Sequence, residues 1–292
     1  MEQDSVGTGR RALMKHFGAG LAGTAALATA GTVGLGLGTT PALADATTDA
    51  AIFNFALNLE YLEAEFYLRA VTGQGLPADL TGGQSTVTGG GLVPFQNTAI
   101  AYFAEKIAVD ELAHVRFIRA VLGSAAVPEP DINFTDAFTA LALAAGLIAP
   151  GQTFDPFASE VGFLLAGYIF TDVGVTAYAG AAASLTSATL PYAASILAAE
   201  GYHIGAIRAR LSEIGGSAAT NAISSLRQKL SGVGDNGLNY QNNPCNFTNV
   251  DSQGQAYRRT PQQVLSIVYG ANKVSKGGFF PNGATGTFTT AS

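Results

Sequence analysis

The sequence predicts an all-α protein, built as a four-helix bundle with one long crossover connection and an irregular C-terminal extension. Three observations predict this class. Four long segments show the apolar periodicity of helices. Ala, Leu and Glu dominate these segments, and the strict alternation typical of strands is absent. Gly-, Thr- and Pro-rich stretches separate the segments, and the stretch between the second and third is long enough to cross the bundle.

The first 44 residues are predicted to be an export signal that precedes the folded part. Arg10 and Arg11 stand before a weakly apolar Ala/Gly/Leu stretch, as in twin-arginine signals. The small residues Ala42 and Ala44 suggest cleavage before Asp45. We therefore expect export by the twin-arginine route, to the periplasm or out of the cell. The alternative is an uncleaved membrane anchor, which a stretch rich in Gly and Thr fits poorly.

Composition limits what the folded part can be. The chain has a net charge of −6 and no basic cluster, so nucleic acid is not an expected partner. The longest apolar run, 161–170, is shorter than the roughly 18 residues that a membrane span needs, so we expect no span after the signal. Cys245 is the single cysteine. An internal disulfide is therefore excluded, and stability must come from packing.

The bundle itself is predicted to occupy residues 45–215. Its four helices are expected at 49–71, 95–122, 156–185 and 190–214. The crossover between the second and third helices contains the apolar segment 135–148, which predicts a short additional helix.

Residues 216–292 are predicted to be an extension that covers the bundle and not a separate domain. Within it, 217–230 has the pattern of a helix, whereas 236–249 is rich in Asn and Gly and is expected to be irregular. Phe279 and Phe280 lie in a Gly/Pro-rich turn region and are expected to pack on the bundle.

A further short helix is predicted to begin at Pro261. Thr260 is placed to act as its N-cap, and Gln263 stands three residues later, which is the spacing of a capping box. Proline is favoured at the first helical position because its missing N–H would have no partner there.

Two Glu-x-x-His sequences carry the strongest functional signal. Glu111 with His114 lies in the second predicted helix, and Glu200 with His203 lies in the fourth. Residues three apart share one face of a helix, so each pair can direct a carboxylate and an imidazole at one point inside the bundle. Buried carboxylates are costly unless they are paired or bind a metal. A cation between the two pairs explains both, although either histidine alone could be a hydrogen-bonded core residue.

The first helix offers further carboxylates. Glu60, Glu63 and Tyr67 share one face, and Glu65 points elsewhere. Glu60 is the first choice as a metal ligand and Glu63 the second, with a solvated acidic face as the alternative. Tyr67 is a candidate for the reaction as a hydrogen-bond donor beside the ligands, or else a core aromatic residue.

The third helix lacks the expected carboxylate. The position that matches Glu60 is occupied by Thr171, and Asp172 beside it is rotated by about 100° around the helix. Three alternatives remain open: Asp172 reaches the site through a local distortion, Glu63 substitutes from the first helix, or one metal position is poorly held.

The chain resembles the ferritin-like superfamily, and within it the desiccation-related branch of bacteria and plants. The resemblance rests on these stretches: FALNLEYLEAEFY, DELAHVRFI, DVGVTAYAGAA, AAEGYHIGAIR, RTPQQVLSIVYG and GGFFPNG. It implies a ferritin-like four-helix bundle with a di-iron or di-manganese centre. The positions that match family ligands are Glu60, Glu111, His114, Glu200 and His203, whereas Thr171 does not match.

With a metal centre of this kind, dioxygen or peroxide is the expected small-molecule substrate. Two iron or manganese ions are expected, or one if the centre is degenerate. The hypothesis is an oxidoreductase that oxidises ferrous iron or removes peroxide, as a ferroxidase, peroxidase or manganese catalase does, in oxidative or desiccation stress. The alternative is a non-catalytic stress protein, structural or binding in role, with a degenerate site. A homo-oligomer is compatible with either.

Overall fold

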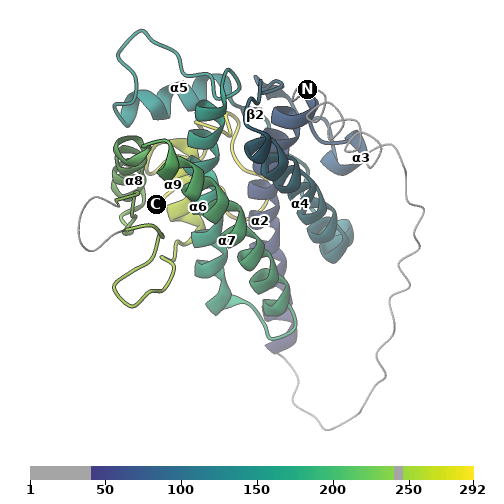
Figure 1. Cartoon of the computed structure of the whole chain (residues 1–292). Coiled ribbons are helices and arrows are strands. Elements are labelled where there is room, and N and C mark those ends of the chain that lie inside the picture. Colours follow the sequence, from purple (N-terminus) through teal and green to yellow (C-terminus); the bar gives the residue numbers. More distant parts are fainter. Residues whose placement is uncertain (1–40, 240–245) are drawn as a thin grey trace.

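The computed structural model describes residues 41–239 and 246–292, and for 41–46 the backbone alone. The predicted export signal up to residue 40 and Cys245 lie outside the described residues. The described chain forms a bundle of four long helices with smaller helices at one end and one side (Figure 1). The predicted all-α class is confirmed.

The four long helices pack as two pairs. α2 (Pro41–Thr72) lies against α4 (Thr98–Leu122), and α6 (Glu160–Ala181) lies against α7 (Leu190–Glu213). The pairs meet through α2 with α6 and α4 with α7 (Figure 1). The space between them is therefore lined by one face of every long helix.

Capping residues set where the long helices begin, and apolar periodicity alone did not identify these residues. α4 begins after Asn97, whose side-chain oxygen accepts hydrogen bonds from the amides of Ala99 and Ile100. α6 begins after Ser159, whose hydroxyl accepts the amide of Gly162. The third helix therefore starts later than the predicted residue 156. It ends in a short 3-10 turn, η2 (Ala182–Ser184).

The connections contain small elements, and all but one of those described below were not predicted. The Gly/Thr-rich loop after α2 includes α3 (Ala78–Thr81) and β1 (Val87–Thr88). A 3-10 turn, η1 (Gly123–Ala125), follows α4. β1 pairs in parallel with β2 (Ile132–Asn133), which fastens the loop to the start of the crossover. The predicted crossover helix is confirmed as α5 (Thr135–Ala144).

The C-terminal extension covers one side of the bundle. α8 (Ser217–Ser231) and α9 (Pro261–Tyr269) contact each other and α6. The predicted capping box at the start of α9 is present. Phe279 is almost fully buried and its ring packs edge-on against Phe138 of α5, so the predicted packing of the tail is confirmed.

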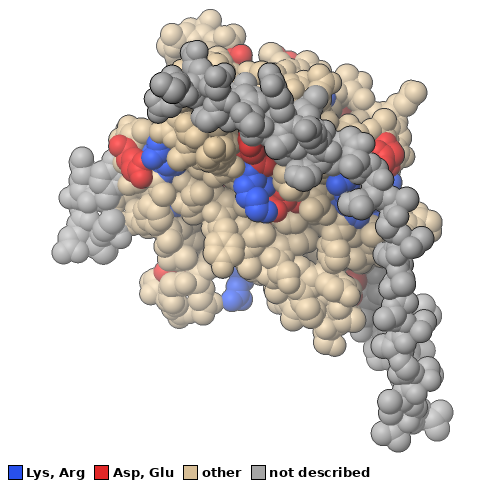
Figure 2. Space-filling view, turned by 45° about the vertical axis from the view of Figure 1, so that its right-hand side comes forward, with Lys and Arg blue, Asp and Glu red and all other residues tan. Residues whose placement is uncertain are grey.

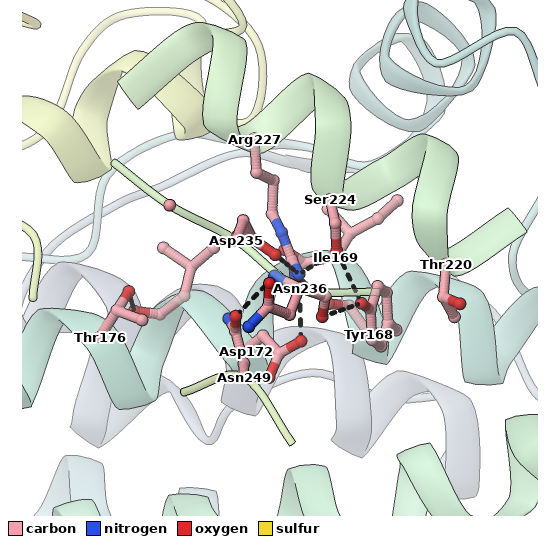
Figure 3. A network of polar contacts seen from close by, with 12 residues as sticks. Tyr168, Ile169, Asp172, Thr176, Thr220, Ser224, Arg227, Asp235, Asn236 and Asn249 are labelled. Carbon is pink, nitrogen blue, oxygen red and sulfur yellow. Dashed lines mark hydrogen bonds and ion pairs between the residues drawn. The ribbon is translucent and has the colours of Figure 1, made fainter. Parts of the chain in front are cut away.

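A buried network of charges joins the extension to the bundle (Figure 3). Asp172 of α6 pairs with Arg208 of α7 at 2.6 Å and with Arg227 of α8 at 3.0 Å. Asp235, in the segment after α8, pairs with Arg227 at 2.7 Å and Arg259 at 2.8 Å. All five side chains are at least nine-tenths buried. Removing Asp172 would leave Arg208 without a carboxylate, and removing Asp235 would do the same to Arg259.

α6 is the one helix of the described residues that is long and apolar enough to cross a membrane, with a mean hydropathy of 1.4 over its window. Of that window, 83% is buried inside the structure, as expected for the central helix of a bundle. The apolar window is longer than the continuous run 161–170 because residues such as Gly, Ala and Thr, which follow that run in the helix, add few charges. The face in Figure 2 shows few charged side chains, in line with a chain that is 12% charged.

Candidate metal centre

The two Glu-x-x-His pairs meet between α4 and α7. Nδ1 of His203 lies 3.0 Å from Oε1 of Glu111 and 3.7 Å from Oε1 of Glu200. Nδ1 of His114 lies 3.3 Å from Oε2 of Glu111 and 3.7 Å from Oε1 of Glu200. The two imidazole rings are 6.1 Å apart between centroids. The helical spacing of three residues therefore brings both motifs into one cluster.

α2 adds Glu60 to this cluster. Its Oε2 lies 3.2 Å from Nδ1 of His114, and its Oε1 accepts a hydrogen bond from the hydroxyl of Tyr178 on α6. One ligand atom from each of four residues lies within 4.8 Å of the others, so a single ion could contact all four. These residues are Glu60, Glu111, His114 and Glu200.

Glu63, one helical turn after Glu60, is held by a short hydrogen-bond chain. The Thr171 hydroxyl donates to its Oε2 at 2.7 Å. The hydroxyl oxygen of Tyr67 lies 2.8 Å from that of Thr171. Because the proton of Thr171 is used on Glu63, Tyr67 is the donor in the second bond. Tyr67 is therefore linked to the cluster through the residue that replaces the expected carboxylate.

Glu63 and Glu200 lie together against a glycine of α6. A methyl group at Gly174 would lie 2.9 Å from Oε1 of Glu63 and 3.2 Å from Oε2 of Glu200. Both distances are shorter than an ordinary contact, so the absence of a side chain at Gly174 is what gives the two carboxylates their room. Glu63 of α2 thus stands where a carboxylate of α6 was expected.

Asp172 is not part of the cluster. Its Oδ2 accepts hydrogen bonds from Arg208 at 2.6 Å and Arg227 at 3.0 Å. The rotation of one residue around α6 turns it toward α8, and no distortion of the helix brings it back. Of the three alternatives for completing the site, the structure brings Glu63 to the cluster and leaves Asp172 in the charge network of the extension.

The burial and hydrogen bonding of these residues fit a metal ion. The four carboxylates and His203 are each 5% exposed or less. Within the described part of the chain, both oxygens of Glu200, Oε1 of Glu111 and Nδ1 of His203 make no hydrogen bond of good geometry, although the last two atoms lie 3.0 Å apart. Buried polar atoms without a partner are costly, and a cation would satisfy all of them. Carboxylate oxygens with imidazole nitrogens suit iron or manganese, and four carboxylates balance the charge of two divalent ions.

The same crowding shifts the protonation of the carboxylates. Burial, followed by the neighbouring Glu111 charge, raises the pKa of Glu200 to about 8. Burial likewise raises the pKa of Glu111 to about 7, against the effect of its histidine neighbours. Without a cation between them, these groups hold protons near neutral pH.

The histidines respond in the opposite way to burial. Burial lowers the pKa of His114, but the charge of Glu60 and the hydrogen bonds to its carboxylate neighbours outweigh it and raise the pKa to about 12. Burial also lowers the pKa of His203, but the neighbouring carboxylates of Glu111 and Glu200 outweigh it and raise the pKa to about 11. A metal ion must displace these protons when it binds.

Two residues beside the cluster were not singled out from the sequence. Oδ2 of Asp110 lies 3.1 Å from Nε2 of His203, which orients the ring with Nδ1 toward Glu111. Tyr178 hydrogen-bonds Glu60. Asp110 directly precedes Glu111 in the sequence, but the periodicity of α4 alone does not reveal that its side chain contacts α7. Tyr178 lies seven residues after Thr171 on the same face, a spacing that could have identified it.

Comparison with known proteins agrees with this arrangement. The family described as the ferritin-like domain matches residues 48–213, which is more than half of the chain. The matched segment contains α4, α6, α7, most of α2 and both Glu-x-x-His motifs.

Two curated proteins are similar over most of the chain. The desiccation-related protein PCC13-62 of Craterostigma plantagineum is 34% identical over 266 residues, covering 82% of this chain and 83% of its own length. The ferritin-like catalase Nec2 of Nesocodon mauritianus is 30% identical over 271 residues, covering 82% of this chain and 84% of its own. No solved structure matches.

Proposed function

Because the chain belongs to the ferritin-like domain family, we propose that it binds two iron or manganese ions at the cluster and removes hydrogen peroxide. The reaction is dismutation, in which two molecules of hydrogen peroxide give two of water and one of dioxygen. One observation carries the proposal: four buried carboxylates and two imidazoles converge, and several of their polar atoms have no hydrogen-bond partner.

The roles of the ligands follow from their positions. Glu111 and Glu200 each lie close to both histidines, so both carboxylates would help to hold the ions. His114 and His203 would each bind one, and Glu60 and Glu63 would complete the two ends. The metal ions supply the change of oxidation state that peroxide chemistry needs. The chain supplies position, charge balance and a site closed to bulk water.

The chain also offers a place to hold the protons that the reaction moves. Burial and the charge of Glu200 raise the pKa of Glu63 well above its usual range. Oε2 of Glu63 accepts a hydrogen bond from Thr171, so Oε1 is the oxygen that would either bind an ion or, when released from it, hold a proton of the peroxide. The Tyr67 hydroxyl fixes Thr171 in turn.

Peroxide removal is preferred to the oxidation of ferrous iron on account of the relative that is named a catalase. The same centre could oxidise ferrous iron with dioxygen, and the two activities share every ligand. Oxygen evolution from peroxide separates them, since iron oxidation consumes dioxygen and dismutation produces it.

The test begins with elemental analysis of protein purified without chelator, beside a Glu111→Ala sample. We expect about two ions of iron or manganese per chain, lost in the variant, and oxygen evolution from peroxide by the metal-loaded protein alone. Two ions with ferrous iron oxidation but no oxygen evolution would assign the protein to iron chemistry instead.

A second candidate is a stress-related binding or structural protein without catalysis. The similarity to the desiccation-related protein favours it, as does Thr171 in place of a carboxylate. A folded, helical protein that takes up no iron or manganese when either is added would select this candidate.

We also propose that the chain is exported by the twin-arginine route. Arg10 and Arg11, in the segment before the described residues, support it. Replacing both with lysine should leave the uncleaved precursor in the cytoplasm, as fractionation of the native host would reveal.

A further inference from the structure

A second site lies at the end of the bundle that α5 covers. It is a cavity of about 460 Å³, bounded by the glycine-rich segment 89–91, by the start of α5 and by the loop before α6. This volume suits a small organic molecule. None of the proposed metal ligands lines it. It is therefore separate from the metal centre.

The walls of the cavity contain both aromatic and polar side chains. Phe134, Phe154 and Phe157 line it, together with three threonines and Asp155. Oδ1 of Asp155 accepts the amide of Phe157, and Oδ2 has no partner among the described residues. None of the described Lys or Arg residues lines the cavity, and Arg69, which lies against Gly90, is paired with Glu65. A planar aromatic ring with a hydroxyl group fits, since the half-buried ring of Phe154 can pack on it and the exposed carboxylate of Asp155 can accept a hydrogen bond from its hydroxyl.

Rings in contact connect this cavity to the metal centre. The centroids of Phe157 and Phe134 lie 5.1 Å and 5.9 Å from that of Phe66, and Phe66 lies 5.1 Å from Tyr67. The Tyr67 hydroxyl then joins Glu63 through Thr171, by hydrogen bonds of 2.8 Å and 2.7 Å. The rate of electron transfer through a protein falls steeply with the distance between neighbouring groups. Here the neighbouring groups are joined by ring contacts or hydrogen bonds.

We propose that the cavity binds a small phenol that serves as an electron donor to the metal centre, so that the protein also acts as a peroxidase. Two phenol molecules each lose one electron and one proton and become phenoxyl radicals. One molecule of hydrogen peroxide takes up the two electrons and two protons, its O–O bond breaks, and two waters leave. This inference rests on the proposed reaction with peroxide, but the binding site can be tested without it.

Gly91 is a suitable position for a substitution that blocks the cavity. It lines the cavity, a side chain there would enter open space, and its φ is outside the left-handed region. Gly91→Phe should therefore fill the entrance without strain. Gly91→Ala adds one methyl group at the same backbone position and is the matched control. Neither change touches the metal centre.

Guaiacol, a soluble methoxyphenol, is the probe. Its binding to metal-free protein is measured by ligand-observed NMR and calorimetry, and its peroxide-dependent oxidation by absorbance after metal loading. We expect wild type and Gly91→Ala to bind it. Gly91→Phe should bind at least tenfold more weakly and oxidise it at least tenfold more slowly, with oxygen evolution from peroxide unchanged in all three.

Several outcomes would overturn the inference. Absence of guaiacol binding to the metal-free wild type would remove the site. Equal binding, or equal guaiacol oxidation, by Gly91→Phe would place the phenol elsewhere. If none of the three proteins evolves oxygen, the dismutation proposal fails on its own, and the guaiacol measurements still decide whether electrons enter through the cavity.

Discussion

At the scale of single residues, the cluster depends on two positions of α6, Thr171 and Gly174, that carry no carboxylate. Thr171 supplies a hydroxyl in place of a carboxylate and directs it at Glu63. Gly174, one turn later, supplies no side chain at all, and Oε atoms of Glu63 and Glu200 occupy the room beside it. A carboxylate from α2 can complete the cluster because both positions on α6 are small.

Gly174→Ala should separate folding from metal binding. Alanine favours a helix interior over glycine by about 0.5–1 kcal/mol, and the carboxylates that it would contact are ends of flexible side chains, so the fold should persist. The carboxylates must move away, and we expect metal content below half of the wild-type value. Circular dichroism and elemental analysis give the two readouts.

Gly205→Ala is the control for this variant, because it lies in α7 with open space at its Cβ. It should gain helical stability and keep its metal. A Gly174→Ala protein that holds the full complement of metal would show that the space beside Glu63 and Glu200 is not needed.

The titration of the cluster predicts opposite effects of pH on the two forms of the protein. The folded-state pKa values of Glu200 (about 8) and Glu111 (about 7) lie above those of an unfolded glutamate. Their contribution to stability is therefore complete below about pH 4.5 and is lost as pH rises through 7 and 8. The pKa values of His114 and His203 are also raised in the folded state. Their contribution to stability is therefore lost as pH rises above about 6.5, the value for an unfolded histidine.

The metal-free protein should therefore have a lower Tm at pH 9 than at pH 6. Manganese binding should grow tighter over the same range, because the ion competes with fewer protons. Thermal unfolding with and without Mn²⁺ measures both trends, and calorimetry in buffers of different ionisation enthalpy counts the released protons. A metal-free Tm that rises toward pH 9 would contradict the buried, proton-holding cluster.

At the scale of elements, the centre is fixed by how α4 faces α7. The pair Glu111 and His114 fixes two donors on one helix, and Glu200 and His203 fix two on the other. Asp110 ties the helices together, because it belongs to α4 and accepts from His203 of α7. The ring of His203 is thereby held with Nδ1 toward the cluster.

Asp110→Asn should weaken metal binding by about 10- to 100-fold, which is the usual effect of losing a residue that orients a ligating histidine. The amide keeps the shape but not the charge, so stability should change little. A competition assay with a coloured chelator measures the affinity. Lys106→Met, which removes the lysine that bonds Asp110 from the solvent side, serves as control, and an equal loss in both variants would argue against a specific role of Asp110.

At the scale of the whole molecule, the extension is tied to the bundle by buried charges. Asp235 lies between Arg227 and Arg259, and Arg227 also reaches Asp172 of α6. The aromatic rings around Phe279 add apolar contact with α5 and α6. The extension therefore shares the core of the bundle.

Asp235→Ala should lower the free energy of unfolding by about 3–5 kcal/mol, because it leaves the buried guanidinium group of Arg259 without a carboxylate and Arg227 with Asp172 alone. Denaturant unfolding measures the loss, and limited proteolysis should cut the extension first. Glu213→Ala removes an exposed partner of Arg210 and should cost about 1 kcal/mol or less. Equal effects of the two substitutions would mean that the network does not hold the extension.

The sequence by itself determined the four helices, the crossover helix, the capping box at Thr260 and the convergence of the two Glu-x-x-His pairs. These features are local, since helical periodicity decides which residues share a face within one element. Only the tertiary structure decided between Glu63 and Asp172, turned Asp110 toward His203 and opened the cavity beside α5. Those outcomes depend on how far each helix is rotated and shifted against its neighbours, and that relation arises only when side chains from all of them pack together.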